Sequence, residues 1–232
     1  MPKAGWYNNH QGYLRMLFNL DPATLITRIF VLIVAFTIHE FAHAWTANRY
    51  GDMTPRLSGR LTLNPLAHLD PIGSLVLLTA GFGWAKPVPI NPYMLTRRSA
   101  AAVMWVSLAG PVSNVLMAAI AAIPFRLGLV SVGAAFVQNK SFLPTPSQFL
   151  LEFVYINLVL FLFNLIPIAP LDGEKILSYF MPPPISTVMD TIRPFGPFIL
   201  LGVAVIGPFI GLNILGSILG PPLQAMLLLL LG

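Results

Sequence analysis

Long apolar runs alternate along the chain with short polar and proline-rich segments. Three of these runs, at about 22–45, 99–125 and 149–168, are long enough to cross a bilayer, since about 20 helical residues span its hydrocarbon layer. A fourth apolar stretch, 195–232, is interrupted by prolines, so it predicts one or two broken helices. The pattern indicates an all-α polytopic membrane protein, a bundle of about four to six transmembrane helices.

Other segments predict elements that do not cross the membrane. The mixed residues 1–21 are typical of an interfacial segment, and the apolar run at 72–85 is too short to span the hydrocarbon layer, which favours a re-entrant or interfacial element. The proline-rich stretch KPVPINP, 86–92, bars a helix and favours extended backbone. We therefore expect a re-entrant or extended hairpin element near residues 72–92. For the proline-rich part alone, a rigid connector is the alternative.

Composition supports a membrane protein with a single domain. Of the 232 residues, 56% are hydrophobic and 9% are charged, and the mean hydropathy is +0.77, so lipid must solvate much of the surface. We expect one membrane-embedded domain over 1–232, with its core at about 22–180 and accessory hydrophobic helices at 195–232. Because the chain contains no cysteine, disulfides and thiolate metal sites are excluded.

The 13 lysines and arginines indicate how the chain is oriented. They are spread over loops without a basic stripe, which favours contact with anionic lipid over binding of nucleic acid. Between the second and third spans lie Arg126 and Lys140, whereas six basic residues lie between the first and second: Arg49, Arg56, Arg60, Lys86, Arg97 and Arg98. The positive-inside rule then places the long basic segment in the cytoplasm and the N-terminus outside. The first and third spans run in the same direction, so we expect their C-terminal ends at the same depth.

Three ionisable side chains interrupt the end of the first span, in the stretch TIHEFAHAW. His39 and His43 are four residues apart, so on a helix their rings lie on one face about a turn apart and can share one metal ion. Glu40 follows the first histidine, as in HExxH zinc hydrolases, where the glutamate is the general base. The alternative is a pair of helix-end residues that reach toward water or are hydrogen-bonded inside a bundle. A charged group at this depth costs about 2.5 to 3.5 kcal/mol, which favours a functional role.

A catalytic zinc needs a third protein ligand, and Asp172 is the best candidate. Cysteine is absent, and the remaining histidines are His10 and His68. Asp172 follows the third span at the depth of the HExxH motif, in NLIPIAPLDGEK, where two prolines and a glycine open the helix and allow a turn. Such unwound backbone is tolerated in a membrane where it lines a wet cavity. The alternative is an aspartate that caps a short helix starting at Gly173.

HEFAH in one span and NLIPIAPLDG in a later one resemble the motifs of the site-2 protease family of intramembrane zinc metalloproteases, in its short bacterial and archaeal branch without a PDZ domain. The resemblance extends over about 26–176, through GRLTLNPLAHLDPIG, GWAKPVPINP and AGPVSN. It implies that His39, His43 and Asp172 bind one Zn²⁺ per chain and that Glu40 activates water.

The same resemblance implies a function. The chain would hydrolyse a peptide bond within or near the transmembrane segment of a single-pass membrane protein, as in regulated intramembrane proteolysis. It would be a multi-pass protein of a prokaryotic cytoplasmic membrane, with its active site toward the cytoplasm, and its oligomeric state stays open. Asn164 would hold the substrate or stabilise the oxyanion, with interhelical hydrogen bonding as the alternative. The rival function is a membrane zinc-binding protein or metal transporter, in which Glu40 has no necessary role and repeated halves are usual.

Further polar residues predict supporting roles. Peptide hydrolysis requires an extended substrate, and a proline-rich segment can pair with one as an edge strand, which makes substrate-binding candidates of Lys86, Pro87, Val88 and Pro89. Asn114 is expected near the zinc helix, where it can contact a ligating histidine that needs an acceptor for its other N–H. His68 and Asp70 predict a structural hydrogen-bonded pair in a turn rather than zinc ligands.

Overall fold

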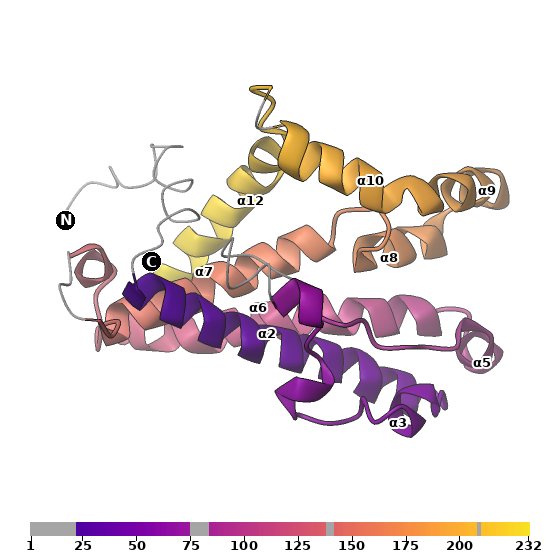
Figure 1. Ribbon diagram of the computed structural model, residues 1–232, viewed down its shortest axis with the longest axis horizontal. Helices are drawn as coiled ribbons and strands as arrows, with labels where there is room; N and C mark the ends of the chain where they lie inside the picture. Colours follow the sequence, from indigo (N-terminus) through magenta and orange to yellow (C-terminus); the bar gives the residue numbers. More distant parts are fainter. Residues whose placement is uncertain (1–21, 75–83, 138–141, 208–209) are drawn as a thin grey trace.

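A computed structural model describes residues 22–74, 84–137, 142–207 and 210–232. The predicted interfacial segment 1–21 and the central part of the predicted re-entrant run, 75–83, lie outside the described residues. Within those ranges the fold consists of helices and irregular loops (Figure 1). The prediction of an all-α fold is confirmed.

Four helices of the described part are long and apolar enough to cross a membrane: α2 (Pro22–Arg49), α6 (Ala102–Arg126), α7 (Pro146–Asn164) and α12 (Ile214–Leu231). They confirm the predicted polytopic membrane protein. The boundaries differ from prediction by three or more residues at four ends. α2 ends at Arg49 rather than at about 45, and α7 begins at Pro146 rather than at about 149. α6 begins at Ala102 rather than at 99, and α7 ends at Asn164 rather than at 168, because the prolines that follow it remove helical N–H donors.

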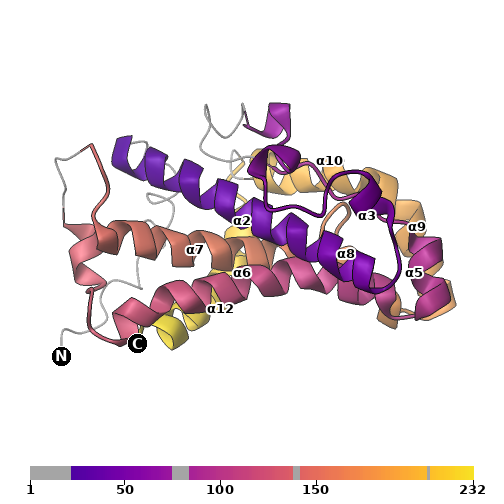
Figure 2. The same ribbon diagram turned by 90° about the horizontal axis from the view of Figure 1, so that it is seen from below.

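α2, α6 and α7 pack side by side, with α6 antiparallel to the other two (Figures 1 and 2). Their apolar faces form the main core, which α12 closes with Leu223, Leu227 and Leu231. Small buried residues of α6, such as Ala118 and Ala122, allow the close approach of helices that membrane packing requires. Because α2 and α7 run in the same direction, their C-terminal ends lie at one end of the bundle, as predicted.

Short elements at this end connect α2 to α6: α3 (Thr54–Leu57), η1 (Pro65–Ala67) and α5 (Pro92–Arg98). The Asn91 side chain caps α5 by accepting hydrogen bonds from the first backbone N–H groups of the helix. Leu95 of α5 is fully buried in a second apolar cluster with Ala47, Ala102 and Val106. This cluster fixes the connection against the ends of both spans. At the opposite end, η2 (Gly133–Phe136) lies between α6 and α7.

Extended backbone follows the short apolar run, as predicted from the prolines. Leu69 and Ala85 form an isolated antiparallel bridge, so the chain just before the run lies beside the run's last residue. Residues 86–91 have no helical turn. The re-entrant course of the run itself stays a prediction, because 75–83 are outside the described residues.

The chain after α7 turns back along the bundle. α8 (Asp172–Phe180) is followed by α9 (Pro183–Ile192), η3 (Arg193–Phe195), α10 (Gly196–Leu201) and the π-helical turn η4 (Gly202–Ile206). The buried Glu174 carboxylate accepts two hydrogen bonds from Arg193, at 2.6 and 3.0 Å, which fastens this tail to α8.

The predicted break in the apolar tail falls between η4 and α12. Pro221 and Pro222, by contrast, lie inside a continuous α12 and do not break it. The division into one domain with an accessory tail stays a prediction.

Candidate metal centre

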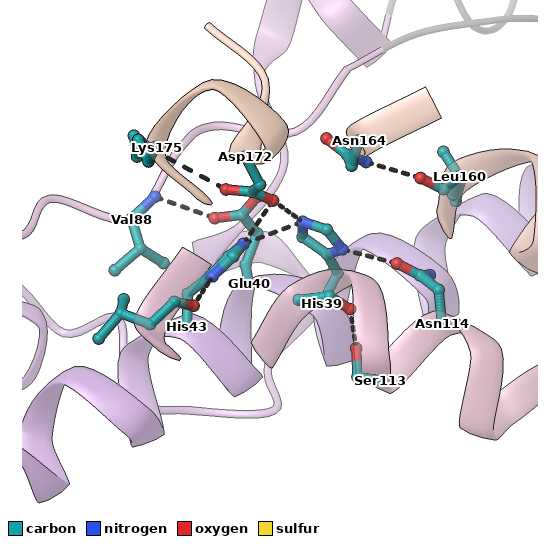
Figure 3. A network of polar contacts seen from close by, with 12 residues as sticks. His39, Glu40, His43, Val88, Ser113, Asn114, Leu160, Asn164, Asp172 and Lys175 are labelled. Atoms are coloured by element: carbon teal, nitrogen blue, oxygen red, sulfur yellow. Dashed lines mark hydrogen bonds and ion pairs between the residues drawn. The ribbon is translucent and has the colours of Figure 1, made fainter. Parts of the chain in front are cut away.

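His39, His43 and Asp172 meet at the end of the bundle that the basic connection covers. The two Nε2 atoms are 3.0 Å apart, and Asp172 Oδ2 lies 3.3 Å from Nε2 of His39 and 3.2 Å from Nε2 of His43 (Figure 3). All three residues are buried. One ligand atom from each lies within 4.8 Å of the others, so the three groups could hold one metal ion.

Asp172 reaches this point because the chain unwinds between α7 and α8. It is the first residue of α8, where Leu171 is the N-cap and makes no side-chain cap, so the alternative of a capping aspartate is wrong. Gly173 permits the tight turn: a Cβ at this position would meet the backbone carbonyls of Leu165 and Ile166. The glycine therefore lets the start of α8 press against the end of α7.

Hydrogen bonds from α6 and α7 fix the tautomers of both imidazoles. The Phe153 carbonyl can only accept, so the Asn157 amide nitrogen faces it at 2.9 Å, and Asn157 Oδ1 then accepts from Asn114 Nδ2 at 3.0 Å. Asn114 Oδ1 is thereby left to accept from His39 Nδ1 at 2.6 Å. The contact predicted for Asn114 is confirmed, and Asn157 orients it.

His43 is fixed in the same way by a backbone group. Its Nδ1 donates to the Val106 carbonyl at 2.7 Å. Both Nδ1 atoms therefore carry the proton, and both Nε2 lone pairs point toward each other and toward the Asp172 carboxylate. Three electron-pair donors at 3.0 to 3.3 Å repel one another unless a metal ion or a proton lies between them.

The donor set suits zinc. Two imidazole nitrogens and one carboxylate oxygen leave a fourth tetrahedral position for water or substrate, the pattern of catalytic rather than structural zinc sites. Each histidine also donates its second N–H to an oxygen, which is the outer support usual for metal-bound imidazole. The buried cluster thus fits the predicted Zn²⁺.

Glu40 lies beside these donors, on the same helix as the two histidines. Its Oε2 accepts a hydrogen bond from the backbone N–H of Val88 at 2.9 Å (Figure 3). Lys175, the nearest cation on α8, has its Nζ 4.0 Å from Asp172 Oδ1. The carboxylate of Glu40 is thus held by the extended segment that crosses the end of the bundle.

A pocket of about 220 Å³ opens onto the metal centre. The three donors and Glu40 line it together with Pro87, Val88 and Asn164. Lys86 and Pro89, the other two substrate-binding candidates, do not line it. The Asn164 side chain donates to the Leu160 carbonyl of its own helix at 3.0 Å (Figure 3).

Two α6 residues of the site were missed in the sequence analysis. Val106 contributes only a backbone carbonyl, which no side-chain pattern can reveal. At Gly110, a Cβ would meet Nε2 of His43 and would lie 2.6 Å from Cε1 and Nε2 of His39. Its signal was available, since it is the glycine of the AGPVSN stretch.

The prediction for His68 and Asp70 is partly wrong. His68 Nε2 pairs with the Thr62 carbonyl and Asp70 accepts from the Gly73 N–H, so the two side chains do not pair with each other. Each has a local backbone partner. Among the described residues, His68 is not part of the metal cluster.

Comparison with known proteins places this geometry in a family. The family model of Peptidase family M50 matches residues 27–203, which is more than half of the chain. The chain belongs to peptidase family M50. This membership confirms the resemblance to site-2 proteases and, with the buried donor set, the predicted zinc metallopeptidase class.

Similar proteins agree with the M50 assignment. The chain is 41% identical over 200 residues to "Putative zinc metalloprotease YwhC" of Bacillus subtilis (strain 168), covering 85% of this chain and 88% of that protein. It is 30% identical over 191 residues to "Putative zinc metalloprotease Rip2" of Mycolicibacterium smegmatis, covering 78% of this chain and 68% of that protein. No solved structure matches the chain.

Replacing Asn114 with alanine should weaken zinc binding by this M50 peptidase about 10- to 100-fold, because His39 Nδ1 loses its acceptor and the ring its orientation. Competition with a chromogenic chelator measures the affinity. Ser113→Ala is the matched control, since within the described part of the chain the Ser113 hydroxyl bonds only to the Gly110 carbonyl of its own helix. Equal zinc affinity in the two variants would contradict this role of Asn114.

Replacing Gly110 with alanine should expel zinc, because the added methyl group would occupy the space beside both Nε2 atoms. Metal analysis of the purified protein measures zinc per chain. Gly220→Ala, in α12, is the control, because among the described residues no atom outside the adjoining part of its own helix lies within 4 Å of a Cβ built there. If Gly110→Ala retained as much zinc as the control, the close approach of α6 to the two imidazoles at Gly110 would not be required for zinc binding.

Proposed function

We propose that the chain cleaves a peptide bond within or near the transmembrane segment of a single-pass membrane protein, as an intramembrane zinc metalloprotease. The observation that carries the proposal is the buried donor triad His39, His43 and Asp172 with Glu40 beside it in one pocket. Regulated proteolysis, in which such cleavage releases a membrane-held protein, is the process this activity serves.

The three donors are proposed to hold one zinc ion per chain. A bound zinc would supply Lewis-acid chemistry, lowering the pKa of a water molecule and polarising the scissile carbonyl. His39 and His43 would bind the ion through Nε2, because their Nδ1 protons are held by Asn114 and the Val106 carbonyl. Asp172 contributes a negative charge that offsets the cation within the low-dielectric membrane.

Glu40 is proposed as the general base. Its carboxylate takes a proton from the attacking water and later delivers that proton to the leaving amine nitrogen. The Val88 N–H holds one carboxylate oxygen at 2.9 Å, which orients the side chain without neutralising it. Its position beside the donor triad favours this role.

Asn164 is proposed to donate its amide to the developing oxyanion or to the substrate backbone. It lines the pocket, and a single such donor contributes about 2.7 to 4 kcal/mol in other hydrolases. Its present partner is the Leu160 carbonyl, so the amide must rotate away from its own helix to act. Interhelical hydrogen bonding, the earlier alternative, has no support from this contact within α7.

The extended segment is proposed to bind the unwound substrate as a strand. Pro87 and Val88 line the pocket, whereas Lys86 and Pro89 flank them and would contribute backbone contacts along the strand. A transmembrane helix must open before its peptide carbonyls can reach the metal centre. Backbone pairing with residues 86–89 offers its freed N–H and C=O groups new partners.

The active site is proposed to face the cytoplasm of a prokaryotic cell from its cytoplasmic membrane. The site lies at the end of the bundle where the basic connection between α2 and α6 is found, and the positive-inside rule assigns that connection to the cytoplasm. Water would enter the pocket from the same side.

A zinc-binding protein or transporter built from the same ligands is the rival proposal. It needs three donors but no carboxylate poised beside them, so the placement of Glu40 in the pocket favours hydrolysis. The two functions respond differently to removal of that carboxylate.

Changing Glu40 to glutamine should abolish cleavage, a loss of about 10²- to 10⁴-fold, while zinc per chain stays unchanged, because the amide cannot take a proton. Proteins trapped by this variant in native membranes supply the substrate, and its cleavage by the unchanged chain is followed on gels. Metal analysis of both proteins is the control. Cleavage at the original rate, or zinc transport by the variant into vesicles, would refute the protease proposal.

Replacing Lys86, Pro87 and Val88 together by glycines should reduce cleavage without releasing zinc, because these residues would contact the substrate strand and none of them is one of the three donors. Steady-state kinetics on the trapped substrate measures the effect. The same glycine replacement of 129–131, in the loop at the opposite end of α6, is the control. Full activity of the 86–88 variant would refute the pairing role.

A further inference from the structure

Two buried charged residues of the basic connection hold the ends of the extended segment 86–91. Asp52 is fully buried just beyond α2, and its two carboxylate oxygens accept from the backbone N–H groups of Thr54, at 2.9 Å, and Asn91, at 2.6 Å. Arg60 is 4% exposed, and its guanidinium donates to the carbonyl of Lys86. Arg60 therefore holds the start of the segment, and Asp52 holds its end. These two residues are called the anchors below.

Prolines leave this segment few N–H donors, and most of them are used. Residues 86–91 carry four backbone N–H groups, since positions 87 and 89 are prolines. The Lys86 N–H donates to the His68 carbonyl at 2.8 Å, the Asn91 N–H to Asp52, and the Val88 N–H to Glu40. The hydrogen bond to the general base thus lies midway between two anchored ends.

The charge on Arg60 also acts at the site. Burial lowers the pKa of the Arg60 guanidinium, and the Glu40 carboxylate opposes this by favouring the charged form. A side chain of this size is rarely buried with its charge unless it has partners to hold. Here the partner is a backbone carbonyl of the segment that crosses the pocket.

We propose that Arg60 and Asp52 are positioning residues that keep the 86–91 segment extended over the metal centre, so that the strand is ordered before the substrate arrives. The proposal rests on the proposed protease function. Without the anchors, the segment would have to be ordered during each binding event, which weakens substrate binding. Binding by strand pairing acts on substrate and transition state alike, so the loss falls on KM more than on kcat.

The test compares Arg60→Met with Arg56→Met. Arg56 lies on α3 in the same connection and is exposed, so the control removes an equal charge without touching the segment. Hydrogen exchange of a peptide spanning 85–92 reports on the anchored N–H groups directly. We expect exchange in Arg60→Met at least about tenfold faster than in the control, and KM for the trapped substrate raised about tenfold with kcat and zinc content little changed. Arg60→Lys, which keeps one donor for the Lys86 carbonyl, should restore part of both.

Each outcome decides the proposal. Exchange and KM equal to those of Arg56→Met would overturn it, and so would faster exchange with an unchanged KM, because the residue would then stabilise the loop only. If Arg60→Met does not fold, Asp52→Asn is the milder variant, since its remaining oxygen keeps one of two bonds, and the same criteria apply. If the unchanged chain cleaves nothing, the protease function fails while the exchange measurement still tests the anchors.

Discussion

The meeting of two imidazole nitrogens with one carboxylate inside the bundle is the constraint on which the rest of the structure depends. Three electron-pair donors at 3.0 to 3.3 Å are unfavourable in a low-dielectric setting unless a metal ion or a proton joins them. To bring them together, α2 and α7 must end at the same depth, and the chain must unwind before Asp172. The parallel course of α2 and α7, and the tight turn at Gly173, are consequences of this requirement.

α6 is the scaffold that makes this arrangement specific. It runs between the two ligand-bearing segments, contributes the acceptors for both Nδ1 atoms, and has a glycine where any side chain would meet the rings. Asn157 of α7 completes the network by orienting Asn114. Metal geometry is therefore set by four helices, α2, α6, α7 and α8, and the extended segment adds the hydrogen bond that holds the base.

Much of this site can be predicted from the sequence, because the positions of its residues depend on helix geometry and on the distribution of charge along the chain. The period of the α-helix places His39 and His43 on one face, and the distribution of basic residues puts the end of the third span at their depth. The hydrogen bond from Val88 to Glu40 does not follow, since a backbone N–H carries no residue-type signal. The sequence analysis uses Arg60 only to orient the chain in the membrane, because no feature of the neighbouring sequence distinguishes a buried arginine from an exposed one in a loop. Pro221 and Pro222 show the same limit, since α12 is continuous through them although prolines usually break a helix.

X-ray absorption at the zinc edge tests the central claim most directly, because it reports the ligands of the bound ion in the intact protein. The account predicts one zinc per chain with four nitrogen or oxygen ligands at about 2.0 to 2.1 Å, two of them imidazole, and a changed spectrum in Asp172→Ala. A spectrum with fewer than two imidazoles, or one that is unaltered when Asp172 is removed, would contradict it.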